Sequence, residues 1–312
     1  MHGILLLDKP TGISSNLALQ KVKRLFKIKK AGHAGTLDPL ATGMLPIAFN
    51  EATKFLQYLL DADKTYSVTM QLGVRTTTSD AEGEIISTRF VPDFSVQDIH
   101  SVFDLFRGEI QQIPSMFSAL KYHGVPLYEY ARKGIHIERA SRAITIYDVT
   151  VLSLENNQVN FTVKCSKGTY VRTLVDDVGE KLGCGAHVTT LRRLSVSPFL
   201  ENQMITIEQC IAMISDNHFF PEKLILPIDI FLSHLSALYF SEECVMQLRQ
   251  GKIILHDHAK KRGMIRLLDQ YKQFFGVGEI IEIGKVAPRR LVCASESAQN
   301  KSHNILRNSH RL

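Results

Sequence analysis

The sequence contains few cysteines and no long apolar segment, and these absences exclude several classes of protein. Its five cysteines lie far apart in a chain of 312 residues, without the Cys-x-x-Cys spacing typical of zinc sites and redox centres. An odd number of scattered cysteines fits a reducing compartment. No segment approaches the roughly 20 apolar residues of a membrane span, and the first apolar run, Ile4 to Leu7, is too short for a signal-peptide core. We therefore expect a cytoplasmic protein with no membrane partner.

Acidic residues are outnumbered by basic ones, 31 to 37, and the imbalance is concentrated near the start of the chain. The first thirty residues hold seven lysines and arginines but a single acid, Asp8. Such a cluster suits an anionic partner such as nucleic acid, although a solvated helix face accounts for it as well. Apolar residues make up 45% of the chain, enough for a full core, and the length fits one large domain with a smaller one.

Local patterns predict a mixture of helices and strands. Apolar runs and alternating residues predict strands over 3–9, 64–74, 83–89, 143–154 and 158–166, the last two forming an antiparallel pair. Helical spacing predicts helices over 16–26, 51–60 and 170–182, and a capping box of Ser95 and Asp98 predicts another helix after residue 95. Residues 114–142 have no sustained period, so we expect an excursion from the core there.

From about residue 230, the predicted helical and strand segments become shorter, and their pattern predicts a small β-rich module. We place the boundary between Pro221 and Asp229, which gives one domain over 1–228 and another over 229–292. The polar, weakly periodic residues 293–312 are expected to form a disordered tail.

The segment "AGHAGTLDPLATG", residues 31–43, is the most unusual stretch of the sequence, because it is rich in glycine and shows neither strand nor helix period. Asp38 precedes a proline in this loop, and an Asp-Pro pair of this kind is typical of a turn or a helix cap. The glycines also allow backbone N–H groups to cradle an anion, although the order of a P-loop is absent. From composition alone, Asp38 can either stabilise a turn or take part in a reaction.

Other candidates have equally plain structural explanations. Arg172 and Tyr170 lie at a strand-to-helix junction, where side chains can project over a sheet end, but Arg172 can also pair with Asp176 four residues later. Tyr66 lies on a predicted strand, where a tyrosine is commonly half-buried core. His33 has no second ligand at metal-binding spacing, and neither does His187, so we predict no metal site.

Eight ordered motifs resemble the tRNA pseudouridine synthase B family. They are "LLLDKPTGISS", "AGHAGTLDPLATGMLPIAFNEATKF", "DKTYSVTMQLG", "IPSMFSALK", "LYEYARKG", "CSKGTYVRTLVDDVGEKLGCGAH", "LRRL" and "VAPRRL". The resemblance is dense over residues 1–198 and rests on fewer residues in the C-terminal module. It implies an α+β fold with a mixed, mainly antiparallel central sheet and flanking helices, the pseudouridine synthase fold, followed by a small β-barrel PUA-like domain.

The resemblance also implies a reaction and a substrate. Members of this family isomerise uridine 55 in the T-loop of tRNA to pseudouridine by flipping the nucleotide out of its stack, without a cofactor. The excursion at 114–142 corresponds to an insertion that grips the T-stem and loop, with phosphates meeting Lys121, Arg132, Lys133, Arg139 and Arg142. The PUA-like domain is expected near the acceptor end of the tRNA, and nothing requires more than a monomer.

Matching the motifs residue by residue assigns expected roles. Asp38 matches the catalytic nucleophile, whether it adds to uracil C6 or attacks ribose C1′, and Arg172 is expected beside it, keeping the carboxylate ionised and aimed. Tyr66 is expected to stack on the uracil and to take a proton late in the reaction. The remaining expected roles belong to Tyr170 and Leu191, which line the nucleotide pocket, to His33, which fills the space the base leaves, and to Lys9, which supports the tyrosine from beneath.

Two other functions are compatible with the same residues. An RNA-binding module or folding chaperone needs only the basic surfaces. A pseudouridine synthase acting on a different RNA needs the same catalytic motifs with another recognition surface.

Overall fold

The computed structural model describes residues 1–215 and 221–293, and the chain divides into two compact units. The larger unit consists of residues 5–47 and 56–223, and the smaller one of residues 1–4, 48–55 and the chain from residue 224 onward. The sequence-based domains 1–228 and 229–292 stay a prediction. Apart from Cys293, the expected disordered tail lies outside the described residues. No helix within the described ranges is both long and apolar enough to span a membrane.

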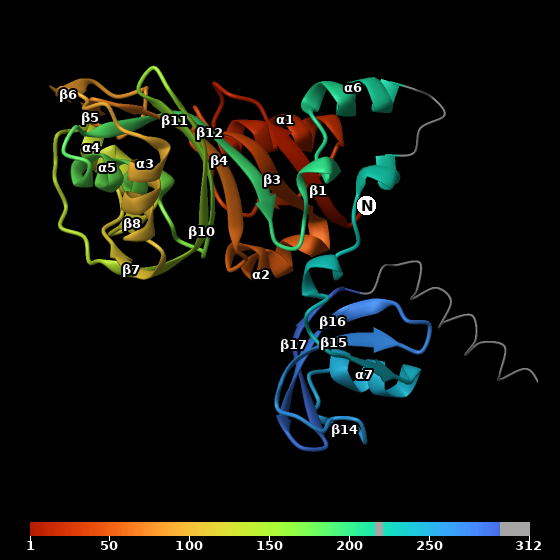
Figure 1. The fold of residues 1–312 in the computed structure, drawn as a ribbon. Coiled ribbons are helices and arrows are strands. Elements are labelled where there is room, and N and C mark those ends of the chain that lie inside the picture. Colours follow the sequence, from red (N-terminus) through yellow and green to blue (C-terminus); the bar gives the residue numbers. More distant parts are fainter. Residues whose placement is uncertain (216–220, 294–312) are drawn as a thin grey trace, which may run out of the picture. The chain divides into compact units, whose positions relative to one another are not determined.

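An eight-stranded sheet is the centre of the larger unit (Figure 1). Its strand order is β1-β3-β12-β4-β11-β10-β7, with β2 paired to β3. The β3–β12 pair is parallel, whereas the pairs from β12 through β7 are antiparallel, so the sheet is mixed and mainly antiparallel as predicted. Its strands are β1 (Gly3–Lys9), β2 (Ala31–His33), β3 (Thr42–Phe49), β4 (Lys64–Leu72), β7 (Gly108–Gln112), β10 (Arg142–Glu155), β11 (Gln158–Cys165) and β12 (Ala186–Val196).

Helices flank this sheet. The α3 helix packs on β10 and the α5 helix packs on β12, and the two helices also contact each other (Figure 1). The predicted capping box is present at α3, where the Ser95 hydroxyl accepts from the Asp98 backbone and the Asp98 carboxylate accepts from the Ser95 backbone. The helices are α1 (Ser15–Leu25), α2 (Leu56–Leu60), α3 (Val96–Asp104), α5 (Val171–Lys181) and α6 (Ile207–Ser215), with short 3-10 turns at Asn50–Phe55, Glu201–Gln203, Pro221–Leu224 and Ile230–Leu232.

Residues 114–141 do not join the eight-stranded sheet, whereas Arg142, the last residue of the predicted excursion, begins β10. Residues 114–141 form a separate hairpin of β8 (Lys121–Tyr122) and β9 (Val125–Pro126), followed by α4 (Leu127–Arg132). A second small hairpin, β5 (Val74–Thr76) with β6 (Ile85–Thr88), follows β4.

The C-terminal part of the chain forms a five-stranded curled sheet in the order β13-β15-β16-β17-β14, with α7 (Glu242–Arg249) packed on it. Its core contains Phe240, Leu248, Leu267 and Val286. This matches the small β-rich module that short segments predict. The strands are β13 (Ala237–Phe240), β14 (Ile254–Leu255), β15 (Gly263–Asp269), β16 (Phe274–Glu282) and β17 (Lys285–Leu291).

Two differences from the sequence-based expectations bear on the site. The glycine-rich segment 31–43 is not entirely loop, because its first three residues form β2 and its last two begin β3. The strand β12 has no counterpart among the predicted elements, since its threonines and arginines interrupt the apolar pattern. Pairing with β3 and β4 on either side nonetheless makes it a central strand.

Candidate active site

The loop that carries Asp38 is held by the start of the chain. The Lys9 side chain is fully buried at the end of β1, and its ammonium donates to the carbonyl oxygens of Pro10 and Ile13, both at 2.8 Å, and of Pro39 at 3.4 Å. The hydroxyl of Ser15, at the start of α1, accepts from the Leu37 N–H at 2.8 Å. These bonds fix the path of the chain on both sides of Asp38.

Arg172 connects Asp38 to a second carboxylate. Its Nε lies 3.0 Å from Asp38 Oδ2, and its Nη1 lies 3.1 Å from Asp80 Oδ2. The guanidinium also donates to the carbonyl oxygens of Thr78 at 2.9 Å and Phe117 at 2.8 Å. Arg172 therefore does not pair with Asp176, the alternative that the sequence left open. Asp176 instead binds Arg75 through two bonds of 2.8 and 2.9 Å.

Asp80 is a site residue that sequence reasoning missed. Its side chain is 3% exposed, compared with 36% for Asp38. Its Oδ1 accepts from the Thr78 hydroxyl at 2.5 Å and from the Glu82 N–H at 3.0 Å, so the carboxylate stabilises a turn while facing Arg172. In the sequence, "TTTSDAEG" has the composition of an ordinary turn, and nothing local indicates a cation 92 residues away.

Burial dominates the titration of Asp38. Loss of water raises its pKa above the ordinary value, the Arg172 charge opposes that rise, and Asp80 adds to it. Arg172 thus offsets the cost of burying the carboxylate only in part. Burial likewise lowers the pKa of Lys9 to about 8, against the opposing attraction of Asp38.

Tyr66 lies on β4, where burial raises the pKa of its phenol and the charge of Arg193 opposes the rise. In the sheet, Tyr66 lies opposite Arg193 of β12, and Val68, two residues further along β4, lies opposite Leu191 of β12. Alternate residues of a strand share a face, so Tyr66, Leu191 and Arg193 lie on one face of the sheet. The structure therefore places the predicted tyrosine and leucine together.

The other predicted residues approach from different elements. Tyr170 directly precedes α5, and its backbone N–H and C=O are both bonded to the Gln112 side chain, at 2.8 and 3.1 Å. The charges of Asp38 and Arg172 both act on its phenol, whose pKa burial raises. His33 ends β2 with a buried Nδ1 that has no hydrogen-bond partner among the described residues. His187 instead binds the Val74 carbonyl at 2.9 Å.

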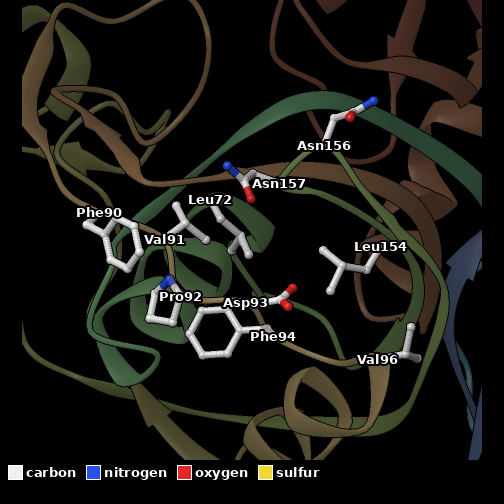
Figure 2. A pocket seen from close by; sticks show the side chains of 10 residues that line it. All are labelled: Leu72, Phe90, Val91, Pro92, Asp93, Phe94, Val96, Leu154, Asn156 and Asn157. Atoms are coloured by element: carbon white, nitrogen blue, oxygen red, sulfur yellow. The ribbon is translucent and has the colours of Figure 1, made fainter.

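Two of the cavities that the described residues form lie in the larger unit. One has a volume of about 510 Å³ and is lined by residues 113–117, by several residues between 131 and 139, and by Thr173 and Asp176 of α5. Its lining residue Phe117 carries the carbonyl that Arg172 binds. The other, of about 420 Å³, is lined by the Phe90–Phe94 loop and the β10–β11 turn (Figure 2). None of the predicted catalytic and nucleotide-pocket residues lines either cavity, whereas Arg139, a predicted phosphate contact, lines the larger one.

Comparisons with known proteins agree along most of the chain. Residues 23–171 match the TruB family pseudouridylate synthase N-terminal domain, 172–233 the tRNA pseudouridylate synthase B C-terminal domain, and 237–292 the pseudouridine synthase II TruB C-terminal domain. The tRNA pseudouridine synthase B of Coxiella burnetii is 50% identical over 293 residues, which cover 94% of this chain and 95% of that protein.

Solved structures show the same fold. A crystal structure of a Cbf5-Nop10-Gar1 complex aligns with a TM-score of 0.72 and 27% identity, covering 93% of this chain and 84% of that one. The structure of an H/ACA RNP bound to a substrate RNA containing 2′-deoxyuridine aligns with a TM-score of 0.71 and 25% identity, covering 94% and 85%. The mixed sheet with flanking helices is thus the predicted pseudouridine synthase fold, and the curled C-terminal sheet fits a PUA-like domain. The chain therefore belongs to the TruB family of pseudouridylate synthases, which makes it an isomerase.

Proposed function

We propose that this enzyme converts uridine 55 in the T-loop of tRNA to pseudouridine, without a cofactor and with Asp38 as the nucleophile. The observation that carries the proposal is the half-exposed Asp38 carboxylate held against the buried Arg172 in a chain of this family. The tRNA is supported by the activity for which the Coxiella burnetii relative is named. The isomerisation breaks the N1–C1′ bond, forms a C5–C1′ bond, moves a proton off C5 and places one on N1.

Access to the uridine requires flipping it out of the T-loop, which costs a few kcal/mol of lost stacking that pocket contacts must recover. A loop nucleotide is already partly unstacked, so this cost is smaller than in a duplex. The flat phenol of Tyr66 supplies a stacking surface and a polar tip for the C5 proton. Tyr170 and Leu191 close the sides of the pocket, and His33 occupies the space that the base leaves.

Asp38 supplies the covalent step in this proposal. Its carboxylate bonds to the nucleotide at uracil C6 or at ribose C1′ and leaves when the C5–C1′ bond has formed. Arg172 aims the carboxylate, because its guanidinium is fixed by two backbone carbonyls as well as by Asp80. The bound nucleotide would cover the exposed part of the carboxylate and so keep water from competing for it.

In this proposal, the basic residues of 114–142 bind the T-stem and loop. Arg132 and Lys133 are exposed at the end of α4, and Lys121 is exposed on β8. Arg172 binds the Phe117 carbonyl within the same segment, so this tRNA-binding segment is connected to the Asp38 site by a hydrogen bond. The PUA-like domain would then contact the acceptor end.

The decisive experiment is tritium release from tRNA carrying 5-tritiated uridine, with Asp38→Asn compared to wild type. We expect no release above background, with normal folding and tRNA binding within about threefold. Asp93→Asn makes the same chemical change at an exposed aspartate beside the Figure 2 cavity and should be fully active. Measurable turnover by Asp38→Asn would rule out the nucleophile. Wild type that itself releases no tritium, with tRNA binding unchanged in both variants, would favour a pure RNA-binding role.

The position within tRNA is tested separately. Mapping pseudouridines in cellular RNA from a deletion strain should show a loss at the T-loop uridine. A loss at other positions only would assign the enzyme to a different RNA target.

A further inference from the structure

The largest fully buried side chain in the structure belongs to Arg193, a residue of β12 to which neither the resemblance nor the proposed mechanism gives a role. It is 1% exposed, and no carboxylate forms an ion pair with it among the residues that the structure describes. Burying a charge without a counterion is expensive unless hydrogen bonds compensate for the lost water. The partners of Arg193 therefore indicate what the fold gains from it.

Those partners lie on both sides of the Asp38 loop. Arg193 Nη2 donates to the Gly35 carbonyl at 3.0 Å, three residues before Asp38, and Nε donates to the Met44 carbonyl at 2.6 Å, six residues after it. One planar guanidinium thus holds both ends of the loop. Its rigid fork reaches two acceptors at once, which a lysine ammonium on a flexible stem does less well.

Two glycines of the loop lie so close to Arg193 that a side chain at either position would meet it. A Cβ on Gly43, at φ +96°, would lie 2.3 Å from the backbone oxygen of Arg193, its registered neighbour in the sheet. A Cβ on Gly35, at φ +79°, would lie 3.1 Å from Arg193 Nη1. Part of the unusual glycine content of "AGHAGTLDPLATG" therefore follows from the close approach of Arg193.

Arg193 also reaches the proposed base-stacking residue. Tyr66 is its direct neighbour on β4, and the charge of the guanidinium lowers the pKa of the phenol against the larger effect of burial. The same positive charge acts on the partly buried His33, whose buried Nδ1 lacks a partner within the described chain. Arg193 is thus shared by the nucleophile loop, the stacking tyrosine and the histidine.

We propose that Arg193 is the positioning residue that sets the Asp38 loop relative to Tyr66, so that nucleophile and stacking surface meet opposite faces of one nucleotide. The proposal rests on the proposed function, because the roles of Asp38 and Tyr66 are part of it. Arg193 itself does not touch the substrate in this arrangement. Its contribution is geometric, and a misplacement of about 1 Å at a reacting centre can cost on the order of 100-fold in rate.

The test compares Arg193→Met, Arg193→Lys and the matched control Arg192→Met. Arg192 is the adjacent residue of β12, but it faces the other side of the sheet and binds Asp8 through bonds of 2.9 and 2.8 Å. Single-turnover tritium release should fall on the order of 100-fold in Arg193→Met, with tRNA binding within threefold of wild type, whereas Arg192→Met should stay within threefold in both. Arg193→Lys, which keeps the charge but not the fork, should still be at least about tenfold slow.

A readout independent of activity is the His33 imidazole, followed by NMR and assigned by the loss of its signal in His33→Gln. Burial and the Arg193 charge lower the His33 pKa, so Arg193→Met should raise it, and Arg193→Lys should leave it near the wild-type value. A purely structural role would lower the unfolding midpoint without slowing the folded fraction, and that result would overturn the proposal. A wild-type rate in Arg193→Lys would also overturn it. Should Arg193→Met fail to fold, Arg193→Lys decides.

The nucleophile role of Asp38 and the positioning role of Arg193 can fail separately. An active Asp38→Asn would refute the proposed nucleophile, but the shift of His33 would still report whether Arg193 holds this part of the fold. An inactive Asp38→Asn together with a fully active Arg193→Met would refute only the positioning role.

Discussion

The ion pair between Arg172 and Asp80 should contribute far more to stability than its surface counterparts. The perturbation is Asp80→Asn, which removes one charge and keeps the shape of the side chain. Both partners are nearly inaccessible, with side chains 7% and 3% exposed and 3.1 Å between Nη1 and Oδ2. Removing one partner of such a buried pair costs about 3–5 kcal/mol, because the other charge is left without compensation.

The expected loss lies at the lower end of that range. Arg172 keeps Asp38 and two carbonyl acceptors, and the asparagine oxygen can still accept from the Glu82 N–H. We therefore expect the free energy of unfolding to fall by about 3 kcal/mol, which corresponds to a drop in Tm of about 6–12 °C for a domain of this size.

Urea unfolding followed by circular dichroism measures this loss, provided that the transition of the larger unit is followed by itself, because two units need not unfold together. The control is Asp176→Asn, which makes the same change in the pair with Arg75, where the side chains are 21% and 25% exposed. Water already screens that pair, so its loss should cost about 1 kcal/mol or less. Equal losses in the two variants would show that burial of the Arg172 pair does not set its strength.

Three further predictions follow from the same structure. The pKa of Lys9 is about 8 in the fold and about 10.4 in the unfolded chain, so the unfolded state binds more protons between these two pH values. Across that window the unfolding free energy of wild type should rise relative to that of Lys9→Met by about 1.4 kcal/mol per pH unit. Urea titrations measure this difference, and a difference that stays constant with pH would contradict the prediction. Gly43→Ala should destabilise much more than Gly12→Ala, measured by thermal unfolding, because both have positive φ but only Gly43 has a backbone oxygen 2.3 Å from its Cβ position. Replacing Arg132 and Lys133 with alanine should reduce the log–log salt slope of tRNA binding by about 1.4, roughly 0.7 per phosphate contact, and an unchanged slope would exclude both from the grip.

Elements specified by neighbouring residues could be predicted from the sequence. The capping box of Ser95 and Asp98 marks the start of α3 because both halves of the motif lie within one turn. The β10–β11 pair was predictable for a similar reason, since alternating apolar residues flank a short turn. The strand β12 was not, because its place is set by partners more than a hundred residues earlier in the chain.

In the candidate site, too, features that depend on residues distant in sequence could not be predicted from local patterns. Residue types and spacing identified Asp38 and Arg172 as candidates but left each with a local explanation, a turn for one and a pair with Asp176 for the other. Family resemblance predicted that the two meet, and the structure places them 3.0 Å apart. Asp80 and Arg193 carry no local signal, because the partners that make them important, Arg172 and the ends of the loop 31–43, are distant in sequence.

Sharing Arg172 between two carboxylates explains a feature that a simple ion pair does not. An aspartate fully paired with an arginine ordinarily has a lowered pKa and is a weak base. Here burial raises the pKa of Asp38, and Arg172 does not reverse that rise, because Asp80 takes Nη1, leaves Asp38 with Nε, and itself disfavours ionisation of Asp38. A carboxylate that is positioned by a cation but not neutralised by it keeps the electron density that a nucleophile needs. Asp80→Asn should therefore lower the pKa of Asp38 while weakening its orientation, so the pH profile of single-turnover release should shift to lower pH even as its maximum falls.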